Sequence, residues 1–237
     1  MFFKRVFLSL LLLLTFLLSL LLHAPARVVS GQVPPVLQAG EWGGTLLTGQ
    51  VSGRYGQWPL YLAWDWRLSA LWRLAIGVDA EVRGLVDARV EASRGPLSWR
   101  VDMVTLRIPA GPSDWLGRGT VLPAWQGGGL AFSRRHGGAW QAGSGSLSTP
   151  GGLLKLSLQG QTHEIQLPPA RIIWRVSEGA LIGDLRQVEG NAALATLTLT
   201  ADNRIQWQIR DRLLRMKAGY SSQNDPDLVV LTVAGPL

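Results

Sequence analysis

The sequence predicts an all-β fold of antiparallel strands, arranged as an extended or sandwich-like sheet or sheets, after a single N-terminal transmembrane helix. Three observations predict it. Segments after residue 40 alternate between apolar and polar side chains, glycine-rich turns separate these segments, and one long uncharged run precedes them all. We expect residues 1–26 to form a cytoplasmic stub and membrane anchor, and residues 27–237 to form a periplasmic β-domain large enough to bury a core.

The N-terminal segment predicts the location of the chain. Lys4 and Arg5 precede an uncharged run over 6–22, which at about 1.5 Å per residue is nearly long enough to cross a bilayer core. The positive-inside rule keeps the two cations in the cytoplasm and places the C-terminal part outside it. Residues 24–26, Ala-Pro-Ala, also fit a signal-peptidase site, but the apolar run exceeds an ordinary signal sequence. We therefore expect a single-pass protein of a bacterial inner membrane with its C-terminal domain in the periplasm.

The clearest strand covers residues 60–68. Its apolar and its polar or small side chains alternate, which places them on opposite faces: Leu60, Leu62, Trp64, Trp66 and Leu68 against Tyr61, Ala63, Asp65 and Arg67. The same alternation predicts strands over 78–82, 86–90, 97–103, 154–158, 172–176, 197–201, 205–209 and 228–233. The turn-forming residues 202–204 predict a hairpin between two of these strands.

Two glycine-rich tracts interrupt the strand pattern. Residues 109–129 are dense in Gly, Pro and Trp, and we expect a crossover there, which could separate two sub-domains or join two halves of one sheet. Residues 137–152 are expected to form a long flexible loop.

Composition excludes several classes of function. The net charge is +7, but acidic and basic residues interleave along the strands, whereas a nucleic-acid interface needs clustered cations. Because the chain has no cysteine, it can form no disulfide, thiolate metal site or thiol nucleophile. We expect no nucleic-acid partner.

No motif predicts catalysis or cofactor binding. His163-Glu164 resembles the start of a zinc-protease motif, but Leu167 stands where the second histidine should be. The segment 143–146 lacks the Gly-x-Ser-x-Gly pattern of a nucleophile elbow, and the glycines at 127–129 are not followed by the Lys-Ser or Lys-Thr of a phosphate loop. The sequence therefore predicts a protein that is not an enzyme and that has no catalytic residue, metal or cofactor.

The chain contains 11 tryptophans. Those on predicted strand faces fit a role in the core: Trp64, Trp66, Trp99, Trp174 and Trp207. Those in glycine-rich or loop-like segments are candidates for a contact surface: Trp42, Trp58, Trp115, Trp125 and Trp140.

A short motif and the strand after it resemble a known family. Residues 44–51 read Gly-Thr-Leu-Leu-Thr-Gly-Gln-Val, a Gly-Thr-x-x-x-Gly motif, and the Trp-rich segment 60–74 follows it. In layout over most of the chain, and most strongly over 40–84, the sequence resembles the protein N component of the type II secretion system, also called the general secretion pathway. That family often has Trp where this chain has Leu47. For Gly44, Thr45 and Gly49 we expect a structural role, because glycines permit a tight turn and close strand approach.

The resemblance implies an inner-membrane, periplasm-facing accessory subunit of a machine that exports folded proteins across the outer membrane, and it implies no catalytic residues. We expect contacts with other type II secretion subunits through strand edges and exposed tryptophans, and membrane contact through residues 6–22. An alternative is a periplasmic lipid-handling or envelope-maintenance protein that binds lipid in an apolar β-groove. A third interpretation is a cell-wall-binding protein that stacks tryptophan on sugars.

Overall fold

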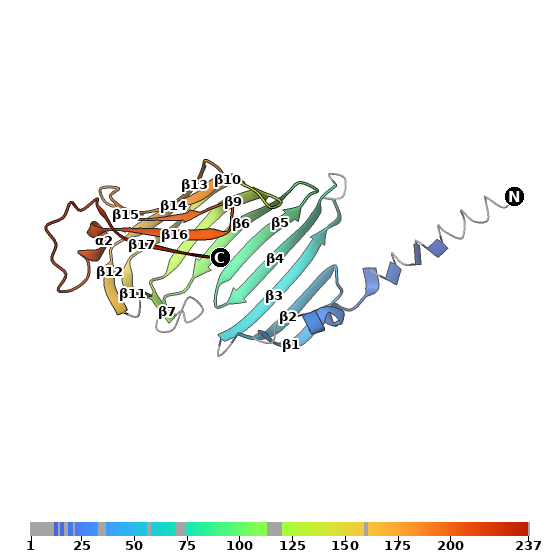
Figure 1. Ribbon diagram of the computed structural model, residues 1–237. Helices are drawn as coiled ribbons and strands as arrows, with labels where there is room; N and C mark the ends of the chain where they lie inside the picture. The colour runs from blue at the N-terminus through green and yellow to red at the C-terminus, as the bar shows by residue number, and fades with distance from the viewer. Residues whose placement is uncertain are drawn as a thin grey trace.

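A computed structural model describes residues 12–13, 15–16, 19–20, 22–32, 37–55, 58–69, 74–112, 120–158 and 161–236. These residues form a 13-stranded sheet and a 4-stranded sheet in which all the strand pairs are antiparallel (Figure 1). The predicted all-β, antiparallel fold class is therefore confirmed.

The large sheet follows chain order with two interruptions. Its strands in spatial order are β1 (Leu37–Gly44), β2 (Thr48–Tyr55), β3 (Trp58–Arg67), β4 (Ile76–Gly84), β5 (Asp87–Arg94), β6 (Ser98–Ile108), β9 (Trp125–Arg135), β10 (Trp140–Thr149), β13 (Ala170–Ser177), β14 (Ala180–Gln187), β15 (Ala193–Leu199), β16 (Arg204–Arg210) and β17 (Val229–Pro236). The interruptions form the small sheet: β12 (Gln161–Leu167), β11 (Gly152–Leu158), β8 (Val121–Leu122) and β7 (Gly111–Pro112). The described residues also include the short helices η1 (Ala26–Gln32) and α2 (Asp211–Leu214).

The alternating segments found in the sequence lie on strands, and the predicted hairpin at 202–204 joins β15 to β16. The glycine-rich tract over 137–152 was wrongly predicted to be a loop, because most of it forms β10. A Cβ at Gly143 would collide with the Leu181 side chain, so this glycine serves close packing within the sheet. The glycines at 127–129 lie in β9, which pairs directly with β6. The sub-domain boundary near 109–129 stays a prediction.

The predicted location is corrected by the structure. Within the described parts of the chain, no helix has the length and apolar character needed to cross a bilayer. Of residues 6–22, the structure describes 12–13, 15–16, 19–20 and 22. The other residues of 6–22 lie outside the described part of the chain. The predicted single-pass inner-membrane protein, with its N-terminus in the cytoplasm and its C-terminal domain in the periplasm, is therefore wrong on this structure.

One face of the large sheet is apolar along its length. A row of paired residues crosses eight neighbouring strands from β3 to β14: Leu62, Val82, Ala88, Leu106, Gly127, Leu147, Ile172 and Leu185. We call this row the long row and the side of the sheet that carries it the inner face. The inner face is apolar because the period-2 alternation of each strand is in register with that of its neighbours.

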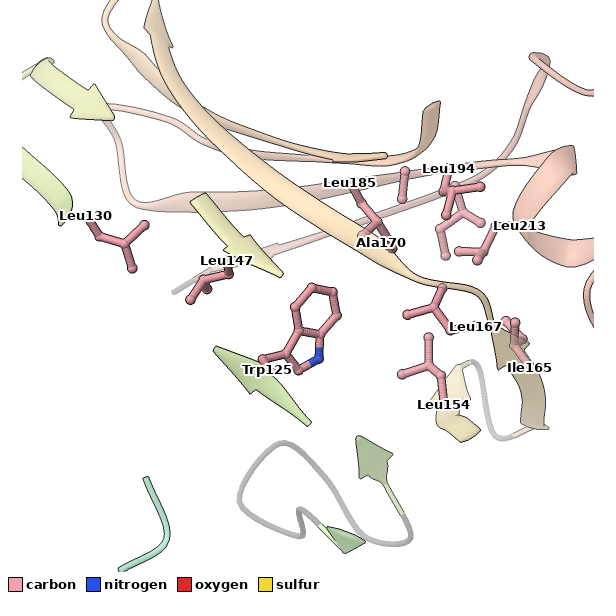
Figure 2. Packing of buried hydrophobic residues seen from close by; sticks show 12 residues of the cluster. Trp125, Leu130, Leu147, Leu154, Ile165, Leu167, Ala170, Leu185, Leu194 and Leu213 are labelled. Carbon is pink, nitrogen blue, oxygen red and sulfur yellow. The ribbon is translucent and has the colours of Figure 1, made fainter. Parts of the chain in front are cut away.

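The core lies over the second half of the inner face. Figure 2 shows Leu147, Ala170 and Leu185 from the large sheet facing Leu154, Ile165 and Leu167 from the small sheet. Leu213 of α2 belongs to the same cluster and is 2% exposed. The small sheet and α2 therefore form the second layer that this part of the sheet needs in order to bury its apolar face.

The sheet bends between its two halves. In Figure 1, β1–β5 are seen face-on, whereas β13–β17 curve round toward an edge-on view. Arg134 links β9 to the β15–β16 turn: it donates hydrogen bonds to the Asn203 side chain and to the Ala201 carbonyl. The inner face thus lies on the inside of the bend, closed over at one end and continuous with β1–β6 at the other.

Candidate functional site

The Gly-Thr-x-x-x-Gly motif forms the turn that joins β1 to β2. The Thr45 amide donates to the Thr48 carbonyl at 2.8 Å, and the Thr48 amide donates to Thr45 Oγ1 at 3.2 Å. Gly44 has a φ of +79°, and a Cβ there would collide with the Thr48 carbonyl oxygen. Glycine and threonine are therefore required by the geometry of this turn.

Trp64 of β3 packs against this turn. A Cβ on Gly49 would lie 2.5 Å from Trp64 Cζ2, so glycine is the only residue that lets the indole approach this closely. The indole Nε1 donates to the Leu46 carbonyl at 2.9 Å, and Trp42 meets Trp64 edge-on with ring centroids 6.4 Å apart. We call residues 44–49 together with Trp64 the turn–Trp unit.

The segment before β1 lies against the turn–Trp unit. The Leu46 amide donates to the Ala24 carbonyl at 2.9 Å, and Pro25 forms an isolated β-bridge with Thr45. Ala26, the first residue of η1, is fully buried. The motif therefore joins three parts of the chain: the segment around η1, the β1–β2 hairpin and β3.

The tryptophans expected to form a contact surface lie in different surroundings. Trp42 and Trp58 are half-buried on β1 and β3, and Trp125 is 8% exposed within the core cluster. Trp140 is half-buried between Trp99, whose ring centroid is 5.6 Å away, and the guanidinium of Arg134. Trp115 lies outside the described residues. The four described side chains are packed against the protein rather than gathered on one exposed patch.

Exposed apolar side chains gather elsewhere, at the ends of two adjacent hairpins. Leu74 and Leu97 are 80% and 77% exposed, and Leu68 and Ile76 are more than half exposed. Ile76 pairs with Arg94 next to the β5–β6 turn that carries Leu97, so the two hairpin ends lie at the same end of the sheet. We call these four residues the hairpin tips. The sequence did not predict this exposure. Alternation shows on which face of a strand a residue lies, but not whether it lies at the end of the strand, where fewer neighbours cover it.

The outer face of β3–β6 carries a row of four carboxylates on adjacent strands: Asp65, Asp79, Glu91 and Asp102. Like charges directly opposite each other destabilise a sheet unless cations intervene. Arg67 lies beside this acid row and bonds both Asp79 and Glu91 at 2.5 Å, while Arg100 bonds Asp102 at 2.7 Å.

Hydrogen bonds hold the acid row in a fixed arrangement. Those from Arg67 to Asp79 and Glu91 raise the pKa of its guanidinium, and that to Asp102 raises the pKa of Arg100. Thr48 donates to Asp65 at 3.0 Å. Among the described residues no group of three or more acidic or histidine side chains is arranged to hold a metal ion. The acids could be read from the sequence, but their alignment across strands depends on the register.

No described helix or strand forms a second layer over the inner face of β3–β6. Among the described side chains of β1–β6, no hydrophobic residue is buried, and Trp66 is 39% exposed. The outward edges of β1 and β17 are the two ends of the large sheet. The arrangement therefore offers surfaces for binding, and the clustered polar groups are engaged in ion pairs.

No protein-family model, curated protein or solved structure matches this chain.

Proposed function

We propose that this chain is an accessory component of the type II protein secretion machinery that acts through contacts with other secretion subunits. The observation that carries the proposal is the turn–Trp unit. The two sequence features on which the resemblance rests, the Gly-Thr-x-x-x-Gly motif and the Trp-rich strand, pack against each other through Gly49 and Trp64. They therefore form one structural unit in this chain, which supports the proposal.

The hairpin tips support a role in protein contacts. Monomeric proteins seldom expose several large apolar side chains side by side, and such patches mark interaction sites. The tips combine Leu74 and Leu97, both more than three-quarters exposed, with Leu68 and Ile76. The open edge of β17 offers a second mode of contact, because its residues from Val229 to Ala234 carry no charge that would discourage strand addition.

The experiment is a deletion of the gene in the organism that encodes the chain, followed by an assay of which proteins reach the culture medium. We expect exoproteins to remain in the cells and secretion to return when the full chain is supplied. Unchanged secretion in the deletion strain would overturn the proposal, as would affinity capture that recovers no secretion subunit.

A double variant locates the contact. Leu74→Asp with Leu97→Asp places charges on the hairpin tips, and we expect it to fail to restore secretion while its abundance equals that of the wild type. Val188→Asp with Leu153→Asp is the matched control, because these residues are 51% and 43% exposed and lie away from the tips and from β17. Restoration of secretion by both variants would exclude the hairpin tips as the contact site.

A further inference from the structure

We call the inner face of β3–β6 the trough, with β4 and β5 as its floor and β3 and β6 as its walls, because the central strands carry the smaller side chains. Its two central strands carry small or medium side chains: Val78, Ala80 and Val82 on β4, and Ala88, Val90 and Ala92 on β5. The flanking strands carry bulky ones: Leu62, Trp64 and Trp66 on β3, and Val101, Met103 and Leu106 on β6. The floor is therefore lower than the two walls over a width of about two strands, or roughly 10 Å.

The trough is apolar along its length and opens out of the core. Met103 and Leu106 of its wall pack against the buried cluster, so the apolar surface runs without a break from the core to the uncovered half of the sheet. All the acids on β3–β6 lie on the outer face or at its turns, as the pairing of Asp79 with Asp65 and Glu91 shows. On the inner face, the floor residues from Val78 to Gly84 on β4 and from Ala88 to Ala92 on β5 carry no charge.

Arg94 lies at one end of the trough. Arg94 follows Ala88, Val90 and Ala92 along the inner face of β5 and is cross-strand neighbour to Ile76 and Trp99. It is exposed and makes no ion pair with the described residues. The other arginine on this face, Arg134, is engaged with the β15–β16 turn. An anionic group above Arg94 would therefore find, at one end of the apolar trough, a guanidinium that can form an ion pair with it.

We propose that the trough binds the acyl chain of an anionic lipid, with the chain along β4 and β5 and the head group at Arg94. From Leu60 to Trp66 the wall is about 20 Å long at roughly 3.3 Å per residue, which suits an extended long-chain acyl group. A channel two strands wide between bulky walls fits a thin flexible chain better than a flat protein surface. The guanidinium of Arg94 at one end matches a ligand with one anionic end. This inference does not depend on the secretion proposal.

The test uses the full chain and 9,10-dibromostearate, whose bromine atoms quench nearby tryptophans. Bound in the trough, it would lie against Trp64 and Trp66, and we expect saturable quenching that oleate reverses by competition. Ala92→Glu places a carboxylate on the floor two residues from Arg94, and it should weaken oleate binding at least tenfold, because it can pair with Arg94 and repel the oleate head group. Ser93→Glu is the matched control: it makes the same change one residue along, on the outer face, and should bind oleate as the wild type does.

A second variant tests the head-group position. Arg94→Gln should weaken oleate binding severalfold and leave the binding of oleyl alcohol unchanged, which a general loss of structure would not do. The proposal is overturned if oleate does not protect against quenching, if Ala92→Glu and Ser93→Glu bind alike, or if Arg94→Gln weakens both ligands equally. A concentration-dependent dimer that Ala92→Glu abolishes and oleate leaves intact would assign the face to a second copy and also overturn it. Because these are binding measurements, their outcome is separate from that of the secretion assay.

Discussion

The two halves of the large sheet carry the same apolar face and differ in what covers it. In β9–β17 the small sheet and α2 lie over the face, and side chains such as Leu147 and Leu185 fall to 8% exposure. In β1–β6 the pattern of alternation is as regular, yet no described hydrophobic side chain is buried. Alternation therefore sets which face is apolar, whereas burial depends on segments that pack from elsewhere in the chain.

The halves also differ in how their polar groups are used. The outer face of β3–β6 holds the acid row with Arg67 and Arg100, which are exposed ion pairs of small net stability. In the second half a carboxylate is fully buried: Asp211 accepts hydrogen bonds from Arg215 at 2.7 Å and from Tyr220 at 2.8 Å. We expect the second half to be the stable unit and the first half to be the part adapted to contact.

The largest test of this comparison truncates two leucines of the long row. Leu185→Ala removes a side chain from the covered half and should lower the free energy of unfolding by about 3 kcal/mol, from lost burial and a residual cavity. Leu62→Ala makes the same change in the uncovered half and should cost about 1 kcal/mol, because water already reaches the site. Chemical denaturation of the two variants measures both values. Equal losses would contradict the idea that only one half is covered.

The sequence was sufficient to predict the strands but not their covering. The alternation over 60–67 identified β3 and its inner face because period 2 is a local property. The small sheet could not be foreseen, since β7–β8 and β11–β12 leave the large sheet at two distant points and meet only in space. The tract over 137–152 was misread because some of its glycines serve close packing and not flexibility, as Gly143 does against Leu181 and Gly145 against Leu130.

The candidate site was predictable to a similar degree. Gly44, Thr45 and Gly49 could be found from their spacing, whereas their packing against Trp64 depends on the β2–β3 register. The registers of β3 to β6 align the acid row, so its pairing with Arg67 could not be read from composition.

Gly49 tests what stabilises the uncovered half. Gly49→Ala would place a methyl group against Trp64 and the Thr45 carbonyl and should destabilise the chain by about 2 kcal/mol. Gly43→Ala is the control: its Cβ would meet the flexible side chain of Gln50 at 3.1 Å, which can move aside. Thermal unfolding compares the two variants. If Gly43→Ala were as harmful as Gly49→Ala, the turn–Trp unit would have no special part in the stability of β1–β3.

Asp211 provides the corresponding test in the covered half. Burial raises the pKa of its carboxyl, but hydrogen bonds from Arg215, Tyr220 and Ser222 outweigh burial and hold the pKa below its ordinary value. A carboxyl with a lowered folded-state pKa adds stability above its unfolded pKa, near 3.9, and loses it as the pH falls through the folded value. Asp211→Asn should therefore be less stable than the wild type at neutral pH, and the difference should shrink in acid. A difference that stayed constant from pH 7 to pH 3 would show that charge is not what Asp211 contributes.

The smallest expected effect lies on the outer face of the uncovered half. Arg67→Gln removes the cation that bonds both Asp79 and Glu91 and leaves like charges opposite one another across three strands. Because the Arg67 side chain is 39% exposed, solvent screens this repulsion, and we expect a loss of about 0.5 to 1 kcal/mol at low salt. The loss should fall as salt is added, since ions screen exposed charges beyond about 10 Å at 0.1 M. Arg83→Gln, which removes a cation that forms an ion pair with one acid, Glu81, and lies over the Tyr61 ring, is the matched control and should have a smaller effect at every salt concentration. A loss for Arg67→Gln that was insensitive to salt would mean that the aliphatic part of its side chain, packed over β4 and β5, contributes more than its charge.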